Sequence, residues 1–208
     1  MEDFPDIYIE SPIKDERNAE AVLHQRRQRL DTLVNKRKAN FAYLKKIHEG
    51  NSFWLNSVSM SAIDIRHFLA LNGTAWERLL SYFYLGLSFG KILECATGFE
   101  LVRESLRLFD EWEYYFSTFS VQSVKYIMAR NVPTAFPDVT DYDISRQTIN
   151  KFNNDILFER LLTPHVGFDL DYVAVMQILC EVLSKIYENI WSEECYRFYF
   201  ISVIFSTI

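Results

Sequence analysis

The sequence predicts an all-α fold, an irregular bundle of five to seven helices around a central, aromatic-rich helix pair. Apolar residues recur at the helical period through most of the chain. Hydrophobic residues make up 49% of the 208 residues and aromatic residues 16%, whereas there are only 6 Gly and 5 Pro. This composition can build a substantial core, and because no long linker divides the chain, one domain is the simplest expectation.

Three segments are expected. Residues 1–13 carry four acids, no base and two prolines, which predicts an acidic N-terminal tail. Residues 14–195 are expected to form a single helical domain, with a long basic helix over 14–48 and an acidic helical body over 53–191. Residues 196–208 form an apolar C-terminal segment.

The helix predicted over 14–48 contains no Gly or Pro and combines an apolar stripe with ten bases and four acids. The stripe partly fits a coiled-coil heptad, but polar residues interrupt it, so packing of its C-terminal half onto the body is favoured. A solvated surface is one interpretation of its charged face. Contact with an acidic partner, an anionic membrane or RNA is the alternative, and the candidate partner-binding residues are Arg26, Arg27, Arg29, Lys36, Arg37 and Lys38.

A short helix is predicted over 62–71, where Ser59 or Ser61 is the candidate N-cap. The central helix is expected to begin at Thr74, because Thr74 and Glu77 match a capping box. Its apolar part, 79–93, is shorter than the roughly 20 residues of a membrane span. Gly86 and Gly90 lie four residues apart, which predicts that a neighbouring helix crosses there.

A second long helix is predicted over 99–130, completing the central pair within 74–131. An apolar stripe is expected to face the core, and a charged face to meet solvent. The stripe consists of Phe99, Val102, Leu106, Phe109, Phe116, Phe119, Ser123 and Ile127, and the charged face of Arg103, Glu104, Arg107, Asp110, Glu111 and Glu113.

An exposed loop over 131–143 is predicted from its two prolines and three acids. A short pattern occurs twice, at residues 4–7 and in this loop at Phe136, Asp138 and Val139. It places an aromatic and an aliphatic residue beside an acid, which is typical of docking peptides. Helices are then predicted over 144–162 and over 170–191, with Asp169 as the N-cap of the second.

The C-terminal segment 196–208 is aromatic and β-branched, which favours an extended conformation. Three interpretations stay open: burial by the body, contact with a membrane surface, or a chain that is a truncated form of something longer.

No catalytic, cofactor or metal site is expected. The four histidines are scattered, and no phosphate-binding loop, serine nucleophile elbow or calcium loop occurs in the sequence. The three cysteines, Cys95, Cys180 and Cys195, form no C-x-x-C pair and are expected to be buried thiols. With an acidic start instead of a signal peptide, a reducing, cytoplasmic location is expected.

The expected function is therefore non-enzymatic: a protein-interaction module, adaptor or subunit of a larger intracellular complex. Its contact surfaces would be the basic helix and the acidic 131–143 loop. The alternative is a peripheral protein that binds anionic membrane through the basic helix and the apolar C-terminus. Nucleic acid is a poor candidate partner because the net charge is −6. An enzyme would require folding to bring distant acids and a histidine together.

Overall fold

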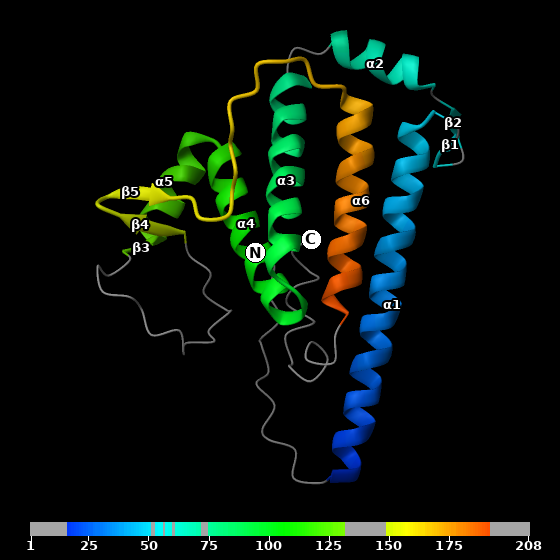
Figure 1. Ribbon diagram of the computed structural model, residues 1–208, viewed down its shortest axis with the longest axis vertical. Helices are drawn as coiled ribbons and strands as arrows, with labels where there is room; N and C mark the ends of the chain where they lie inside the picture. Colours follow the sequence, from blue (N-terminus) through cyan, green and yellow to red (C-terminus); the bar gives the residue numbers. More distant parts are fainter. Residues whose placement is uncertain are drawn as a thin grey trace, which may run out of the picture.

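The computed structural model describes residues 16–50, 53–55, 57–59, 61–71, 75–131 and 149–191, and this part of the chain is mostly helical, as predicted. It contains six α-helices and five short strands (Figure 1). The helices are α1 (Glu16–His48), α2 (Ala62–Leu71), α3 (Ala75–Cys95), α4 (Gly98–Phe116), α5 (Phe119–Met128) and α6 (Tyr172–Ile190). The strands are β1 (Phe53–Trp54), β2 (Val58–Ser59), β3 (Arg130–Asn131), β4 (Asn150–Phe152) and β5 (Asp155–Leu157).

Helix α1 packs antiparallel along α6, as Figure 1 shows for the blue and orange helices. Leu30, Val34 and Ile47 of α1 are buried, and the rings of Phe41 and Tyr187 lie 5.7 Å apart between the two helices. The stripe predicted from sequence therefore faces α6, and the packing of α1 onto the body is confirmed.

Helix α6 packs against α1, α3 and α4. Its buried residues include Val173, Leu179, Ile186 and Tyr187. In the next layer, the rings of Phe89 in α3 and Phe109 in α4 lie 5.3 Å apart. Trp112 of α4 also donates a hydrogen bond of 3.1 Å from Nε1 to the carbonyl of Ser81 in α3. Helices α3 and α4 thus pack on each other, and α6 also packs on α3.

The prediction of one helix over 99–130 is wrong. Ser117 and Thr118 have extended backbone, with ψ of 164° and 158°, and they separate α4 from α5. The Ser117 hydroxyl donates to the carbonyl of Tyr114 at 3.0 Å, and its backbone N–H points to the same oxygen at 3.4 Å. Serine and threonine side chains compete with helical hydrogen bonds in this way, so two of them in sequence end the helix.

The predicted helix over 144–162 is also wrong where the structure describes it, from residue 149 onward. Strands β4 and β5 form an antiparallel hairpin there, with Lys151 opposite Ile156, and β3 pairs with β4 in parallel. Asn153 and Asn154 connect the strands with φ of 48° and 71°. Asparagine tolerates this left-handed conformation better than most residues, and two in succession give the turn that two-residue hairpins prefer.

Three helix caps were predicted, and the structure describes two of these positions. In α2, the Ser61 hydroxyl accepts the N–H of Asp64 at 3.2 Å, and the Asp64 carboxylate accepts the N–H of Ser61 at 2.9 Å, so Ser61 is confirmed as the cap. In α6, the cap is Asp171 and not Asp169, because Asp171 accepts the N–H of Val173 at 2.8 Å. Thr74 lies outside the described residues.

The predicted environment of the cysteines is half correct. Cys180 is buried in α6, and burial raises the pKa of its thiol. Cys95, at the end of α3, is exposed, because the helix ends there and turns its last residues to the surface. Cys195 lies outside the described residues.

Candidate functional site

Helix α5 turns an apolar face outward. None of its residues is buried. Phe119 is 83% exposed and Ile127 80%, and three more apolar residues of the helix, Val121, Val124 and Met128, are also exposed. These five residues are called the α5 face below. The sequence placed Phe119 and Ile127 in the core stripe, and that assignment is wrong because the break at Ser117 and Thr118 reorients the helix.

The polar side of α5 faces the protein. Gln122 donates a hydrogen bond of 3.1 Å to the carbonyl of Tyr114, and Lys125 forms an ion pair of 2.7 Å with Glu113. The hydroxyl of Tyr126 donates to the carbonyl of Asn154 in the β4–β5 turn at 2.9 Å. A surface helix normally buries its apolar side and exposes its polar side. The orientation of α5 is the reverse.

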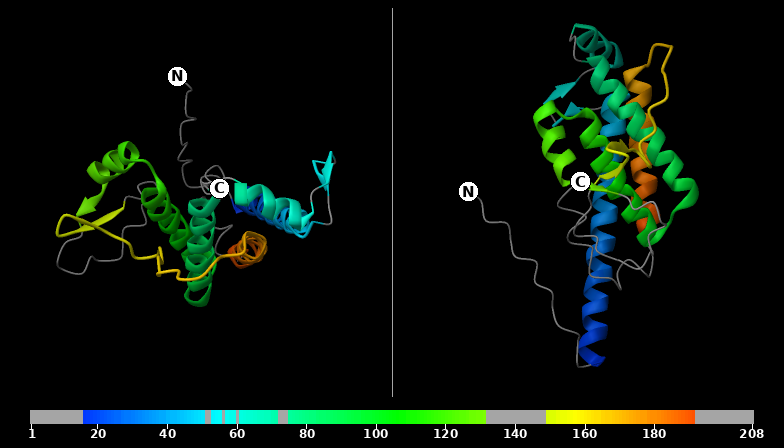
Figure 2. Two further views of the ribbon diagram at one scale, coloured as in Figure 1. Left: turned by 90° about the horizontal axis from the view of Figure 1, so that it is seen from above. Right: turned by 90° about the vertical axis from the view of Figure 1, so that its left-hand side faces the viewer.

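The small sheet fixes this orientation. Lys151 of β4 places its ammonium 3.7 Å from the centre of the Tyr126 ring, a cation–π contact that holds α5 against the hairpin. Figures 1 and 2 show α5 and the β3–β5 sheet together at one side of the molecule, opposite the β1–β2 hairpin. The α5 face is thus held away from the α1–α6 seam.

Acids and bases both lie next to α5. Glu113 and Asp155 are exposed, whereas the two nearby lysines, Lys125 and Lys151, point inward to Glu113 and Tyr126. Asp110 lies on α4 in the same region, and burial raises the pKa of its carboxyl to about 6, against the opposing charge of Lys125. Arg130 of β3 follows two residues after the end of α5, so this region holds three acids and three bases.

A long strap, residues 158–171, leads from β5 past α4 and α3 to α6 (Figure 1). Buried side chains of the helices hold its backbone. Glu111 of α4 accepts the N–H groups of Glu159, Arg160 and Leu161 at 3.0, 2.9 and 2.7 Å. Ser88 of α3 accepts the N–H of Leu162 at 2.9 Å. These contacts fix the hairpin that precedes the strap, and so position α5.

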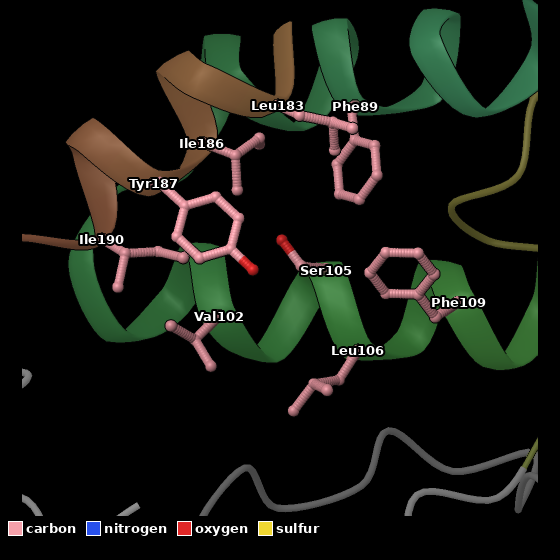
Figure 3. Close-up of a pocket in the computed structure, with 9 residues that line it drawn as sticks. All are labelled: Phe89, Val102, Ser105, Leu106, Phe109, Leu183, Ile186, Tyr187 and Ile190. Atoms are coloured by element: carbon pink, nitrogen blue, oxygen red, sulfur yellow. The ribbon is translucent and has the colours of Figure 1, made fainter. Parts of the chain in front are cut away.

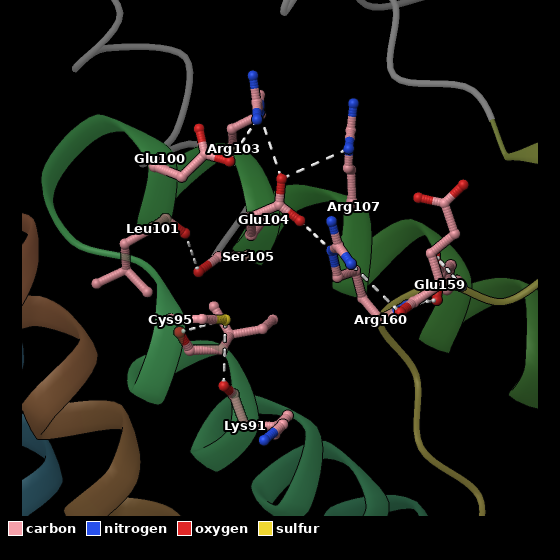
Figure 4. A network of polar contacts seen from close by, with 12 residues as sticks. Lys91, Cys95, Glu100, Leu101, Arg103, Glu104, Ser105, Arg107, Glu159 and Arg160 are labelled. Carbon is pink, nitrogen blue, oxygen red and sulfur yellow. Dashed lines mark hydrogen bonds and ion pairs between the residues drawn. The ribbon is translucent and has the colours of Figure 1, made fainter. Parts of the chain in front are cut away.

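Glu104 provides the second anchor of the strap. It is 4% exposed and lies between the guanidinium groups of Arg103, Arg107 and Arg160, as Figure 4 shows. Burial alone would raise the pKa of Glu104. The net pKa is lowered, because the hydrogen bond and charge of Arg160 and the charges of Arg107 and Arg103 together outweigh burial. Glu104 and Glu111 were predicted to face solvent. They are buried because the strap brings polar partners to them.

A small cavity lies between α3, α4 and α6, and Figure 3 shows the hydroxyls of Ser105 and Tyr187 pointing into it. The Ser105 hydroxyl donates to the carbonyl of Leu101 at 2.6 Å. The cavity volume of about 10 Å³ is close to the space that a single water molecule requires, so the cavity is too small for an organic ligand.

The predicted basic contact residues are spread along α1 and are partly engaged within the chain. Lys38 pairs with Glu188 of α6 at 3.2 Å, and the Arg27 guanidinium lies 5.6 Å from the centre of the Trp191 ring. Arg29 and Lys36 are exposed and form no ion pair in the described part of the chain. Arg26 and Arg37 are half-buried. The other predicted contact residues, Phe136, Asp138 and Val139, lie outside the described residues.

Comparison with protein-family models, with curated proteins and with solved structures finds no match to this chain. Among the helices of the described ranges, none has the length and low charge that are needed to cross a bilayer.

Proposed function

We propose that this chain is a non-enzymatic protein-interaction module, an adaptor or a subunit of a larger complex, and that it binds a partner protein through the α5 face. The observation that supports this proposal is the reversed orientation of α5. Its polar residues make three side-chain contacts to the body, while Phe119 and Ile127 are more than three-quarters exposed. Contiguous exposed apolar residues are typical of binding sites.

The charges define the chemistry of the partner. Interfaces have an apolar centre and a polar rim, and complementary charges on the rims set specificity and the association rate. Since Glu113 and Asp155 are exposed beside α5, the partner is expected to have an apolar centre and a basic rim. In this proposal, the aromatic-rich pair of α3 and α4 is the rigid support of α5.

The exposed bases of α1 are a second contact surface in this proposal. Arg29 and Lys36 lie on α1, which packs on α6, whereas α5 packs on α4 at the other side of the bundle. A partner with an acidic surface fits there. Lys38 and Arg27 already contact Glu188 and Trp191, so they are expected to contribute less to such binding.

Charge placed on the α5 face tests the proposal. The full chain is compared with Phe119→Glu/Ile127→Glu and with a matched control, Ile63→Glu, which adds charge at a site that is 75% exposed on α2. All three proteins are expected to fold equally, because exposed substitutions change stability by about 0.5 kcal/mol or less. Circular dichroism and thermal unfolding check this.

The binding measurement uses a partner that the unchanged chain recovers by affinity purification and that is then purified itself. By calorimetry, its affinity is expected to fall at least tenfold for the double α5 variant and to stay within twofold for Ile63→Glu. Raising salt should weaken binding, because the rims are charged. Equal affinity of the α5 variant and the control would contradict the proposal.

The membrane alternative predicts a different result, and a separate variant tests it. Helices that bind anionic membrane carry Lys and Arg beside the apolar face. Beside the α5 face, the acids Glu113 and Asp155 are exposed and Lys125 and Lys151 point inward, so vesicles containing anionic lipid are expected not to bind the chain at low salt. Flotation of the chain with such vesicles, lost in Arg29→Glu/Lys36→Glu, would favour the membrane function over the proposed one.

A further inference from the structure

An apolar groove of about 580 Å³ lies between α3 and α6, which Figure 1 shows side by side. Strap residues 168–171 bound it, and its volume falls within the range of ligand sites in proteins. Leu87 on α3, Ile178 on α6 and Phe168 on the strap line the groove and are 39%, 59% and 62% exposed. Nothing in the described part of the chain fills it.

The α3 wall of the groove includes two glycines. A Cβ added at Gly86 would lie 3.7 Å from Leu179 Cδ1, which is an ordinary contact, and a Cβ added at Gly90 would meet nothing within 4 Å. Helix α6 thus crosses near Gly86, as the sequence predicts, but no close packing in the described residues requires glycine at either position. Each glycine costs about 1 kcal/mol in a helix interior relative to alanine. Their lack of side chains does allow another backbone to approach α3 closely.

Residues 196–208 have the composition to fill this groove. Nine of these thirteen residues are apolar or aromatic, Arg197 is the one base, and there is no acid. Exposed in water, such a segment would promote aggregation. The charge on Arg197 is also opposite to that of Asp169, an acid that lines the groove, whereas the lining acid Glu94 is already paired with Lys91 at 2.7 Å.

The distance is compatible with docking in the same chain. Among the groove residues of α6, Val182 is the one nearest in sequence to Trp191. The nine residues from Val182 to Trp191 correspond to about 14 Å along a helix. Residues 192–195 can span about 14 Å when extended. From Val182 to Ala174, the groove continues for about 12 Å, a length that four extended residues cover. Residues 196–208 are therefore long enough to occupy the whole groove.

We propose that residues 196–208 pack into the α3–α6 groove of their own chain, with their backbone against Gly86 and Gly90. The segment covers Leu87 and Ile178 and completes the apolar packing on this side of α3. This surface is separate from the α5 face, so the inference holds whether or not α5 binds a partner.

Photo-crosslinking in the full chain tests the proposal. A photoreactive benzoyl-phenylalanine replaces Phe200, and mass spectrometry identifies the crosslinked peptides. Crosslinks within one molecule to residues 82–94 or 174–182 are expected. Gly90→Phe fills the groove and should reduce their yield at least fivefold, whereas Glu77→Phe, an exposed position on the same helix, should leave it unchanged.

Ile178→Glu is a second groove variant, which adds charge at an exposed position and so tests the groove if Gly90→Phe fails to fold. It should lower the yield to a similar extent. Mixing isotopically light and heavy chains shows whether crosslinks join two molecules. Three results would overturn the proposal. These are crosslinks that form only between molecules, crosslinks that form only to other parts of the chain, and a crosslink yield that is unchanged in both groove variants.

Discussion

The Glu111 carboxylate of α4 accepts a hydrogen bond of 2.7 Å from the backbone N–H of Leu161, fifty residues later in the chain. Its oxygens also accept the N–H groups of Glu159 and Arg160. Burial raises the pKa of Glu111, while these three N–H groups oppose the shift. One buried carboxylate thus holds the start of the strap on α4.

Glu111→Gln is expected to destabilise the fold by about 1–3 kcal/mol, because the amide keeps one acceptor oxygen and leaves a buried backbone donor without a partner. Urea unfolding measures the change in free energy, and hydrogen exchange should show faster exchange at Glu159, Arg160 and Leu161. Glu77→Gln is the control, since Glu77 is exposed on α3 and its loss should change stability by about 0.5 kcal/mol or less. Equal stability of the two variants would disprove the anchoring role.

Asp110 is expected to make stability depend on pH. Its folded pKa, about 6, is above the ordinary value of 3.8, so the folded state binds the proton more tightly than the unfolded state. The resulting stability is fully present below pH 3.8 and is lost as pH rises through 6. Asp110→Asn removes this dependence, so the variant should gain about 1–3 kcal/mol relative to the unchanged chain between pH 4 and pH 7.

Unfolding curves at several pH values measure this difference. Asp64→Asn is the contrast, because hydrogen bonds from Ser61 lower the pKa of Asp64, and stability from that group is lost as pH falls. A constant difference between Asp110→Asn and the unchanged chain across pH 4–7 would show that the Asp110 carboxyl is not perturbed by burial.

Apolar burial is expected to stabilise the α1–α6 seam more than its ion pairs do. Leu30 is fully buried, so Leu30→Ala should cost about 2–5 kcal/mol. Lys38 and Glu188 have side chains that are 37% and 56% exposed, and a double-mutant cycle on them should give about 0.2–1 kcal/mol, decreasing with salt. A coupling energy larger than the effect of Leu30→Ala would reverse this ranking.

The sequence predicted the long helices well where apolar residues repeat without interruption. Helices α1, α2, α3 and α6 begin and end within a few residues of the predicted bounds, because period and caps are local signals. The β4–β5 hairpin was missed because apolar residues at helical spacing hid the turn at Asn153 and Asn154. Burial of Glu104 and Glu111 was missed because their partners come from the strap, far along the sequence.

The candidate site was less predictable than the fold. Phe119 continues the stripe of Phe109 and Phe116 at helical spacing, so its exposure depends on the break at Ser117 and Thr118. Ser117 and Thr118, two adjacent hydroxyl residues, were the feature of the sequence from which this helix break could have been predicted. The predicted bases of α1 are recognisable from charge alone, but which of them contact α6 depends on the register of two helices.

Tyr126 is expected to determine whether α5 stays folded against the hairpin. Its hydroxyl bonds to Asn154 and its ring contacts Lys151, so Tyr126→Leu loses both contacts while it keeps an apolar side chain. Because α5 has no buried residue, its loosening should be local, with little change in global unfolding. Hydrogen exchange should show at least tenfold faster exchange in α5 and unchanged rates in α3 and α6. Phe119→Leu, on the outward face, is the matched control and should leave α5 protected, so equal protection in both variants would show that Tyr126 does not anchor the helix.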